Sequence, residues 1–410
     1  MKVGIISIGD ELMNGFTVDT NSSWISRKIL AYELLDVVSK ITVKDSKDDI
    51  KSSLDTLISS NIDYIFITGG LGPTHDDITR DTLSEYFDSE LVTDEIYYNK
   101  LVQFFKAKNR KSEHLKSQAQ ILENSYPIPN RYGTALGMKI DYKKTQIFVL
   151  PGVPQEVKGM MSKEILPTYF ESNFAKEEKY TTLLTSGIYE SQLFEILKKT
   201  IIENKNYFKI SFLPSYAGVK IRLSSEKKNK SLTEFKIKVL DLIQDYVYGF
   251  DMDKIEEIIA KKLIKEEMTI AIAESCTGGS ISKKLTDVAG SSKYLKGSII
   301  AYSNNIKENF LNVKSDILLE KGAVSSEVAC MMAENIRKKF NVDIGVSTTG
   351  ISGPTGGSKE KPVGLIYIAI STKKEKIVKK SIFKLERKEH RKVATYKALS
   401  MINSLVNNKK

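Results

Sequence analysis

Short, wholly apolar runs alternate with amphipathic segments along the first third of this 410-residue chain. Val3–Ile8 and Tyr64–Thr68 have the length of buried strands, and Asp48–Ser59 places its apolar residues at helical spacing. Ile147–Leu150 is a further buried strand. This alternation predicts an α/β fold, with a parallel-rich sheet covered by helices on both faces. Ligands bind at the carboxyl ends of the strands in such sheets, so the segments after the strands are the candidate sites of chemistry.

The composition changes twice along the chain, which is long enough for more than one domain. Residues 1–171 carry the alternation of strands and helices. Residues 172–250 are rich in Lys, Tyr and Phe and show no catalytic constellation, so we expect a small α+β connector there. Residues 251–410 return to an α/β pattern, with a buried strand over Thr269–Ala273 and a last helix over Arg387–Val406. We therefore predict three domains with these boundaries.

The positive charge of the chain lies entirely in the last domain. Residues 1–250 hold 33 Lys and Arg against 33 Asp and Glu, whereas residues 251–410 hold 29 against 18, which accounts for the net charge of +11. This balance suits an anionic substrate, and it is equally typical of a lysine-rich solvated surface. The basic cluster Lys373–Lys392 has few aromatic residues to stack on bases, so nucleic acid is not an expected partner.

The composition also argues against several classes of protein. A run of about 18 apolar residues is absent, so no membrane association is expected. The first residues have neither the long apolar segment nor the cleavage site of a signal peptide, which favours a cytoplasmic protein. Cys276 and Cys330 lack metal-ligand spacing, so they predict neither a zinc site nor a disulfide framework.

The densest motif of the N-terminal domain follows its strand at residues 64–68. Gly69 and Gly70 let the backbone approach a ligand closely and offer N–H groups to an anion. His75, Asp76 and Asp77 come soon after, and carboxylates suit Mg²⁺ or Mn²⁺ held against a phosphate. Alternatively, either aspartate caps the helix that follows, and the histidine lies at the surface.

Carboxylates follow other strands of the same domain. Asp10 and Glu11 come after the first strand, and Asp45 follows the extended segment that ends at residue 43. Asp19 and Asn21 stand at the start of a helix, where each is as typical of a cap as of a ligand. Acids at three strand ends beside a Gly-Gly turn predict a phosphate- or cofactor-binding site.

In the last domain, Ser275 stands between a strand and a helix. That position exposes a hydroxyl next to the N–H groups of a helix N-terminus. A serine nucleophile needs a base, for which His390 is a weak candidate. A buried neutral Lys307 is an alternative, with the Tyr302 hydroxyl as a proton relay. From the residues alone, Ser275 is as consistent with a helix cap as with a nucleophile, and Lys307 is more typical of a surface cation than of a base. Cys276 is a rival nucleophile.

The Gly69–Thr79 loop, with Gly9-Asp10-Glu11 and Pro151-Gly152-Val153-Pro154, resembles the molybdopterin-binding domain of molybdenum-cofactor enzymes. Through to its C-terminus, the chain is similar to the competence/damage-inducible CinA family. The resemblance implies a three-layer N-terminal domain that hydrolyses ADP-ribose with a divalent Mg, Mn or Co ion. The implied metal ligands match Asp45 and Asp77, with Asp10 and Glu11 nearby, and the implied substrate-binding residues are Gly69, Gly70, Gly72 and Thr74.

The last domain resembles the nicotinamide mononucleotide deamidases through three motifs. These are Ala273–Gly279, Ala301–Asn304 with Lys307, and Thr348–Pro354 with Gly356-Gly357. The resemblance implies an α/β domain that needs no cofactor and that releases ammonia and nicotinate mononucleotide. The implied catalytic residues are Ser275, Tyr302 and Lys307, and the implied substrate-binding residues are Thr277, Gly278, Gly279, Asn304, Thr349, Gly350, Gly353 and Gly356.

Together these roles give a mechanism and leave two alternatives. Lys307, through Tyr302, takes the proton of Ser275, and N–H groups around Thr277–Gly279 hold the oxyanion. The Gly350–Gly357 loop cradles the substrate phosphate. The alternatives are a competence or DNA-damage accessory protein that binds nucleic acid, and a molybdopterin-binding module without catalysis. We expect a homodimer whose ligands are nicotinamide mononucleotide and ADP-ribose.

Overall fold

The computed structural model describes residues 1–109, 115–176, 179–225 and 231–407. The chain forms two compact units, Met1–Lys179 and Tyr180–Lys410. The first unit corresponds to the predicted N-terminal domain and extends past residue 171. The second holds the connector and the last domain.

The first unit is built on a six-stranded sheet of order β2-β1-β3-β8-β7-β6. Its first four strands pair in parallel, and the last two join antiparallel at one edge, so the sheet is parallel-rich as predicted. The strands are β1 (Lys2–Ile8), β2 (Asp36–Val43), β3 (Tyr64–Thr68), β6 (Ser125–Ile128), β7 (Gly137–Tyr142) and β8 (Thr145–Leu150), and a separate pair is formed by β4 (Leu91–Thr93) and β5 (Gln120–Leu122).

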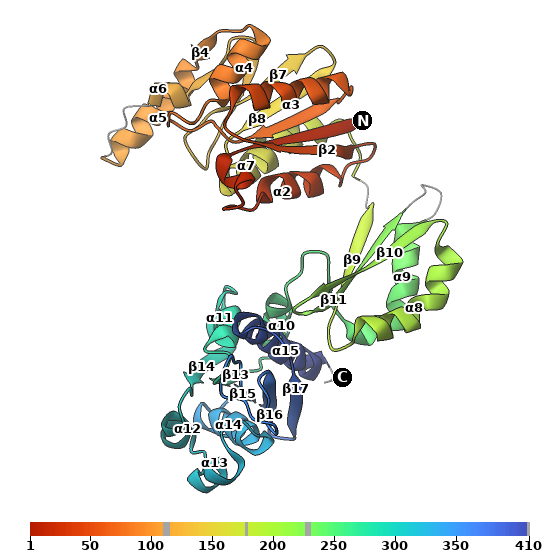
Figure 1. Ribbon diagram of the computed structural model, residues 1–410, viewed down its shortest axis with the longest axis vertical. Coiled ribbons are helices and arrows are strands. Elements are labelled where there is room, and N and C mark those ends of the chain that lie inside the picture. Colours follow the sequence, from red (N-terminus) through yellow and green to blue (C-terminus); the bar gives the residue numbers. More distant parts are fainter. Residues whose placement is uncertain (110–114, 177–178, 226–230, 408–410) are drawn as a thin grey trace. The chain divides into compact units, whose positions relative to one another are not determined.

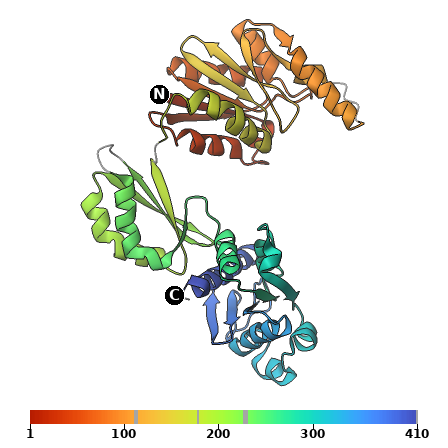
Figure 2. The same cartoon turned by 180° about the vertical axis from the view of Figure 1, so that it is seen from behind.

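Helices cover both faces of this sheet (Figures 1 and 2). Every residue of β3 is buried, as expected of a central strand with helices on either side. One face packs against α2, α7 and the π-helical η1, and the other packs against α3, α4, α5 and α6. The helices are α1 (Asp10–Met13), α2 (Thr20–Ile29), α3 (Lys47–Ser59), α4 (Thr79–Phe87), α5 (Glu95–Ala107), α6 (Leu115–Gln118), α7 (Pro154–Met160) and η1 (Met161–Phe170).

The second unit begins with the connector, whose four-stranded antiparallel sheet has the order β10-β11-β9-β12. This is the order of a ferredoxin-like β-α-β-β-α-β fold. Both helices pack their apolar stripes against one face of the sheet, where Phe208 stacks on Phe235. The elements are β9 (Tyr180–Thr185), α8 (Glu190–Asn204), β10 (Phe208–Ser215), β11 (Gly218–Ser225), α9 (Leu232–Ile243), the 3₁₀ turn η2 (Gln244–Tyr246) and β12 (Val247–Phe250).

The last domain has a five-stranded mixed sheet of order β14-β13-β15-β16-β17. α10, α11 and α15 pack on one face, and α12, α13 and α14 pack around the other. Its strands are β13 (Ile270–Glu274), β14 (Leu295–Ile300), β15 (Ile344–Gly350), β16 (Leu365–Ser371) and β17 (Lys376–Ile382). Its helices are α10 (Ile255–Lys265), α11 (Ser280–Thr286), the 3₁₀ turn η3 (Ser291–Lys293), α12 (Asn304–Leu311), α13 (Ser315–Lys321), α14 (Ser326–Lys339) and α15 (Arg387–Asn407).

The basic cluster Lys373–Lys392 has a structural explanation, because it contains the edge strand β17 and the start of α15. Lysines on an edge strand discourage pairing with another chain.

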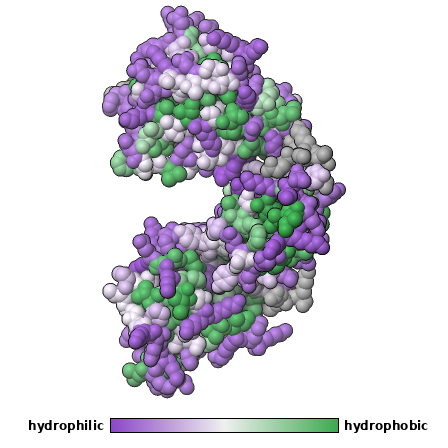
Figure 3. Space-filling view, turned by 45° about the vertical axis from the view of Figure 1, so that its right-hand side comes forward, coloured by the Kyte–Doolittle hydropathy of each residue, from purple (hydrophilic) through white to green (hydrophobic). Residues whose placement is uncertain are grey.

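Hydrophilic residues dominate the face seen in Figure 3, and apolar residues form separate patches. Among the helices that the structure describes, none is both long and apolar enough to span a membrane.

Candidate active site

Ser275 is the first residue after β13, in the turn that leads into α11. Its backbone N–H donates to the carbonyl of Thr348 on the adjacent strand β15, at 3.0 Å. Its own carbonyl accepts from the N–H of Gly278 at 3.1 Å. Ser275 is only 8% exposed. The turn therefore fixes the serine at the carboxyl end of a buried strand, where the sequence predicted chemistry.

A buried carboxylate holds the other end of this turn. Glu274 is fully buried and accepts from the N–H groups of Ile281 and Ser282, at 3.1 and 2.8 Å, and from the Ser282 hydroxyl at 2.6 Å. These N–H groups belong to the first turn of α11, where a carboxylate is favoured. These two N–H groups are therefore engaged by Glu274 and are not free to serve Ser275.

Lys307 lies on the first turn of α12 and is only 2% exposed. Its Nζ donates to the carbonyl of Ala301 at 2.8 Å and lies 3.3 Å from Ser275 Oγ. Burial lowers the pKa of Lys307, because the charged ammonium loses its hydration. A serine hydroxyl in direct contact with a lysine of lowered pKa has the arrangement that a nucleophile and its base require.

Tyr302 does not lie between these two groups. Its side chain is 61% exposed, and its hydroxyl accepts from Arg387 Nη2 at 2.7 Å. The preceding residue, Ala301, is fully buried, and successive side chains of an extended segment point in opposite directions. The relay suggested by the sequence is therefore not the contact found here, and Lys307 reaches Ser275 directly.

The alternative nucleophile, Cys276, and the alternative base, His390, have different surroundings from Ser275 and Lys307. Cys276 is buried in the apolar core, and burial raises the pKa of its thiol to about 12, so it is poorly suited to act as a thiolate. His390 is fully buried, with its ring nitrogens 2.9 Å from Ser352 Oγ and 3.0 Å from the carbonyl of Gly364. Burial lowers the pKa of His390. This histidine holds the glycine-rich loop.

Thr277 and Thr349 have structural partners. The Thr277 hydroxyl lies 2.8 Å from that of Thr348, and the Thr349 hydroxyl donates to the carbonyl of Ala323 at 2.7 Å. Asn304 is exposed at the start of α12. Positive φ angles characterise the predicted glycines Gly278, Gly279, Gly353 and Gly356. Gly350 packs on Cys276, because a Cβ added there would lie 3.2 Å from its Sγ.

The sequence reasoning missed two arginines of α15. Arg387 donates to the carbonyl of Gly353 at 2.8 Å, and Arg391 donates to the carbonyl of Thr277 at 3.0 Å. They share a face of α15 with His390, because residues three and four apart on a helix are neighbours. The spacing of residues 387, 390 and 391 was the sequence feature that could have indicated that these side chains act together. Through these bonds, α15 contacts both the turn that carries Ser275 and the glycine-rich loop.

In the first unit, the Gly-Gly turn packs closely against its own chain, and the predicted approach to a ligand stays a prediction. Gly69 and Gly70 have φ angles of 112° and 65°. A Cβ on Gly69 would lie 2.2 Å from the carbonyl oxygen of Ile8, and one on Gly70 would lie 2.1 Å from Thr79 Oγ1. Only glycine fits at both positions.

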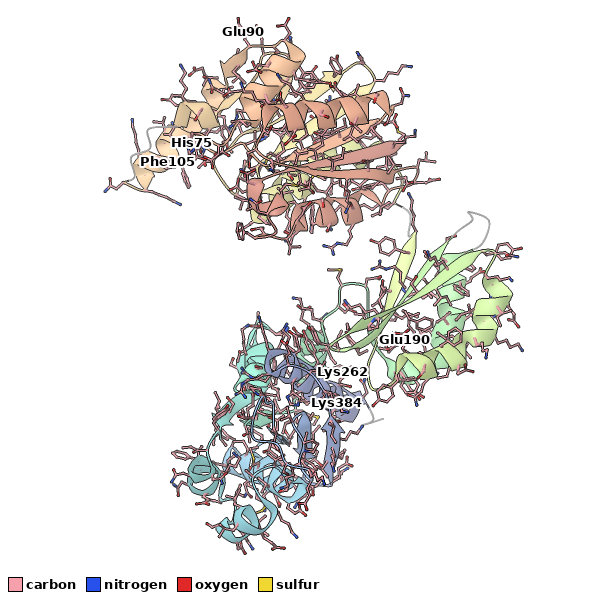
Figure 4. The ribbon with its side chains drawn as sticks, in the orientation of Figure 1. His75, Glu90, Phe105, Glu190, Lys262 and Lys384 are labelled. Carbon is pink, nitrogen blue, oxygen red and sulfur yellow. The ribbon has the colours of Figure 1, made fainter. Side chains whose placement is uncertain are left out.

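Asp77 organises the loop that follows this turn. Its carboxylate accepts from the N–H of Gly72 at 2.7 Å, the N–H of Thr74 at 2.9 Å and the Thr74 hydroxyl. α4 begins at Thr79 without a side-chain cap, so Asp77 is not its cap. The side chain of His75 is 98% exposed and lies 3.2 Å from the carboxylate of Asp76; Figure 4 labels this histidine.

The carboxylates predicted to bind metal form a looser group. Asp10 and Asp45 each accept from the other's backbone N–H, at 3.4 and 2.9 Å. Burial raises the pKa of Asp45, and the charges of Asp10, Glu11 and Asp77 act in the same direction. Within the described part of the chain, no group of three or more His, Cys, Asp or Glu side chains could hold a metal ion. These acids therefore do not fit a preformed metal centre. Asp19 caps α2 by accepting from the N–H of Ser22.

Three family models match consecutive parts of the chain. Residues 4–170 match a probable molybdopterin binding domain, residues 180–249 match the damage-inducible protein CinA KH domain, and residues 252–406 match the CinA C-terminal domain. Together they span both compact units.

Full-length relatives agree with these matches. A CinA-like protein of Cytophaga hutchinsonii is 41% identical over 373 residues, which cover 89% of this chain and 88% of the relative. A putative competence-damage inducible protein of Thermoanaerobacter pseudethanolicus is 35% identical over 406 residues, which cover 98% of each. Among solved structures, the competence/damage inducible protein CihA of Agrobacterium tumefaciens is 33% identical, with 38% of this chain and 98% of that one covered and a TM-score of 0.36.

Proposed function

The chain belongs to the CinA family, and on that premise we propose that its last domain hydrolyses the carboxamide of nicotinamide mononucleotide. The products are ammonia and nicotinate mononucleotide. The observation that carries the proposal is the buried contact of 3.3 Å between Lys307 Nζ and Ser275 Oγ. A serine that only capped α11 would not need a desolvated lysine beside its hydroxyl.

The proposed reaction begins with proton transfer between these two side chains. The neutral amine of Lys307 takes the proton of Ser275 directly, and Ser275 Oγ attacks the carboxamide carbon. The proton on Lys307 then passes to the departing nitrogen, the C–N bond breaks and ammonia leaves. Water, deprotonated by the same amine, cleaves the acyl-serine ester and restores Ser275.

The oxyanion of this reaction needs backbone donors that are not already engaged. The N–H of Gly278 bonds to the carbonyl of Ser275, and the first turn of α11 bonds to Glu274. Among the described residues, the N–H groups of Cys276 and Thr277 have no acceptor on another residue. We assign the oxyanion to these donors, which follow the nucleophile as in other serine hydrolases.

Positive charge near the site supports an anionic substrate. Arg387 and Arg391 reach the glycine-rich loop and the nucleophile turn, respectively. Guanidinium groups suit phosphate, because their planar donors match its oxygens. In this proposal the phosphate of the mononucleotide binds on the side of the Gly350–Gly357 loop, and the nicotinamide ring lies toward Ser275.

An ammonia-release assay with nicotinamide mononucleotide tests the proposal. Ser275→Ala should reduce turnover by at least about 10³-fold, because the nucleophile and its base act as a unit. Ser292→Ala, at an exposed position of the same domain, is the matched control and should keep wild-type activity. Turnover by Ser275→Ala at the control rate would reject the assignment.

For the first unit we propose a ligand that carries phosphate, bound at the Gly69–Thr79 loop, with ADP-ribose as the candidate substrate. The support is the close-packed Gly-Gly turn and the loop held by Asp77. The acids around it do not fit a preformed metal centre, so we assign no metal-dependent step. Release of AMP from ADP-ribose by the full chain, with and without Mg²⁺, Mn²⁺ or Co²⁺, tests hydrolysis. Retention of ADP-ribose without turnover would favour a binding module.

A nucleic-acid role has less support. RNA-binding KH domains clamp the backbone with a Gly-x-x-Gly loop. Residues 180–249 contain Gly187, Gly218 and Gly249, and no two of them have that spacing. The competence or DNA-damage role stays a prediction, which a salt-dependent mobility shift tests. The predicted homodimer is tested by the mass of the chain in solution.

A further inference from the structure

The first unit contains a large cavity away from the glycine-rich turn. Its volume is about 720 Å³, which is within the range of small-molecule sites. It lies between α5 and the segment that joins β6 to β7, and no residue of the Gly69–Thr79 loop lines it. α5 stands at one end of the unit in Figure 1, and Figure 4 labels Phe105 on the same helix.

One wall is a stripe of α5. Lys100, Phe104 and Lys108 line the cavity at intervals of four residues, which places them on one face of the helix and its C-cap. Phe104 is 48% exposed, so part of its ring is open to a ligand. The ammonium of Lys108 lies 4.1 Å from the centre of the Phe104 ring. This wall therefore presents an aromatic surface flanked by cations.

The opposite wall holds a second aromatic ring in a fixed position. The ring of Tyr132 packs on Gly159 of α7, where an added Cβ would lie 2.0 Å from a ring carbon. The backbone N–H of Tyr132 donates to Asn130 Oδ1 at 3.0 Å. Asn130 is buried and donates to the carbonyl of Ala135 at 3.1 Å and to Glu156 Oε2 at 2.7 Å. Tyr132 nevertheless remains 46% exposed.

The charged side chains among the described lining residues of the cavity are cations, and the carboxylates of Glu156 and Glu164 lie behind this lining. Lys100, Lys108 and Arg131 line it, and no carboxylate is among its described lining residues. Arg131 also pairs with Glu164 at 3.0 Å, which holds the guanidinium beside the cavity. Two partly exposed rings with three cations would attract a ligand that combines a flat ring with negative charge.

We propose that this cavity binds a nucleoside phosphate, with its base on Tyr132 or Phe104 and its phosphates at Lys100, Lys108 and Arg131. A flat base has a face that stacks on aromatic rings, and phosphate oxygens accept from lysine and arginine. The site is separate from the Ser275 domain, so it goes beyond the proposed amidase and does not depend on it.

Binding of ADP to the full chain, measured by calorimetry, tests the inference. Saturating nicotinamide mononucleotide, with the Ser275→Ala variant as host, keeps ADP out of the deamidase site. Tyr132→Ala and Lys100→Glu should each weaken ADP binding at least tenfold. Lys106→Glu, on an exposed position of α5 outside the cavity, is the charge-matched control and should bind like the host.

Binding of adenosine and binding of inorganic phosphate, measured separately, distinguish the stacking contact from the charged contacts. Tyr132→Ala should weaken adenosine binding and leave inorganic phosphate binding unchanged, whereas Lys100→Glu should do the reverse. Equal ADP affinity in all three variants would overturn the proposal, as would an affinity reduced only by Asp77→Asn in the glycine-rich loop. Ammonia release by the full wild-type chain is measured in parallel. It tests the amidase proposal separately, because it does not depend on ADP binding in the first unit.

Discussion

Replacing Lys307 with Met separates the proposed catalytic role of this residue from a packing role. The two side chains have similar length, so the variant removes the amine and keeps the buried volume. In the structure the amine contacts Ser275 Oγ at 3.3 Å and donates to the Ala301 carbonyl at 2.8 Å. The variant therefore loses the base for Ser275 and leaves one buried carbonyl without its donor.

The two losses have very different sizes. Removal of a general base reduces the rate by about 10²–10⁴-fold, which corresponds to roughly 3–5 kcal/mol in the activation barrier. The unpaired carbonyl of Ala301 costs about 1–3 kcal/mol of stability. Removal of the buried amine offsets part of this loss of stability, because burial disfavours the charged form of Lys307. We expect the free energy of unfolding to change by less than about 2 kcal/mol.

The pH dependence follows from the lowered pKa of Lys307. Only the neutral amine accepts a proton, so kcat/KM should rise with pH through the folded-state pKa, below the usual range of lysine. At a pH between the pKa of Lys307 in the folded chain and its higher pKa in the unfolded chain, the unfolded chain binds more protons than the folded chain. The free energy of unfolding of the wild type therefore also rises with pH in that window. Lys307→Met should lose both effects.

Ammonia release and thermal unfolding, each measured across pH, check these expectations. Lys314→Met, at an exposed position of the same domain, is the matched control and should resemble wild type. Activity of Lys307→Met within about threefold of wild type would refute the reasoning, because a general base contributes far more. A large loss of stability with a proportional loss of activity would indicate a packing role only.

Three further predictions concern the residues around these sites. Cys276→Ala should keep the proposed deamidase activity within about threefold, because a buried thiol with its pKa raised to about 12 is poorly suited to act as the nucleophile; a 10²-fold loss in the ammonia assay would contradict this. Glu274→Gln should lower kcat about tenfold or more, because the amide cannot accept all the bonds from Ile281 and Ser282 that fix the turn; kinetics and unfolding measured together will show whether the effect exceeds the stability loss. Gly70→Ala should lower the unfolding free energy by about 1–3 kcal/mol, because its φ is 65° and its Cβ would meet Thr79; an unchanged denaturation midpoint would show that the turn relaxes.

Strong local patterns in the sequence predicted the strands β1, β3, β8 and β13 and the helices α3 and α15. β3 is wholly buried, and its apolar residues alone identify it. β17 escaped prediction, because its lysines read as a charged surface, and an edge strand needs pairing on only one side. The short strands β4 and β5 form only with each other, so no local pattern announces them.

The site was less predictable than the fold, for a physical reason. The turn position of Ser275 is a local property of strand, glycines and helix, and it could be read from the sequence. Which group reaches its hydroxyl depends on side-chain direction at Tyr302 and Lys307, and this is set by the packing of α12. Likewise, the sequence predicted Asp77 as a metal ligand and gave no sign of its bonds to the loop backbone, which depend on the loop conformation.

The role of α15 follows from combining these contacts. Arg391 and Thr277 are 114 positions apart in the sequence, and Arg387 bonds to both Tyr302 and Gly353. His390, between these arginines, fixes the glycine-rich loop through Ser352. The turn that carries Ser275 and the Gly350–Gly357 loop are therefore positioned by the same helix. Because α15 also supplies a large part of the apolar core, loosening the helix would disturb both loops at once. In this domain, the integrity of the core and the geometry of the proposed catalytic site depend on the same segment.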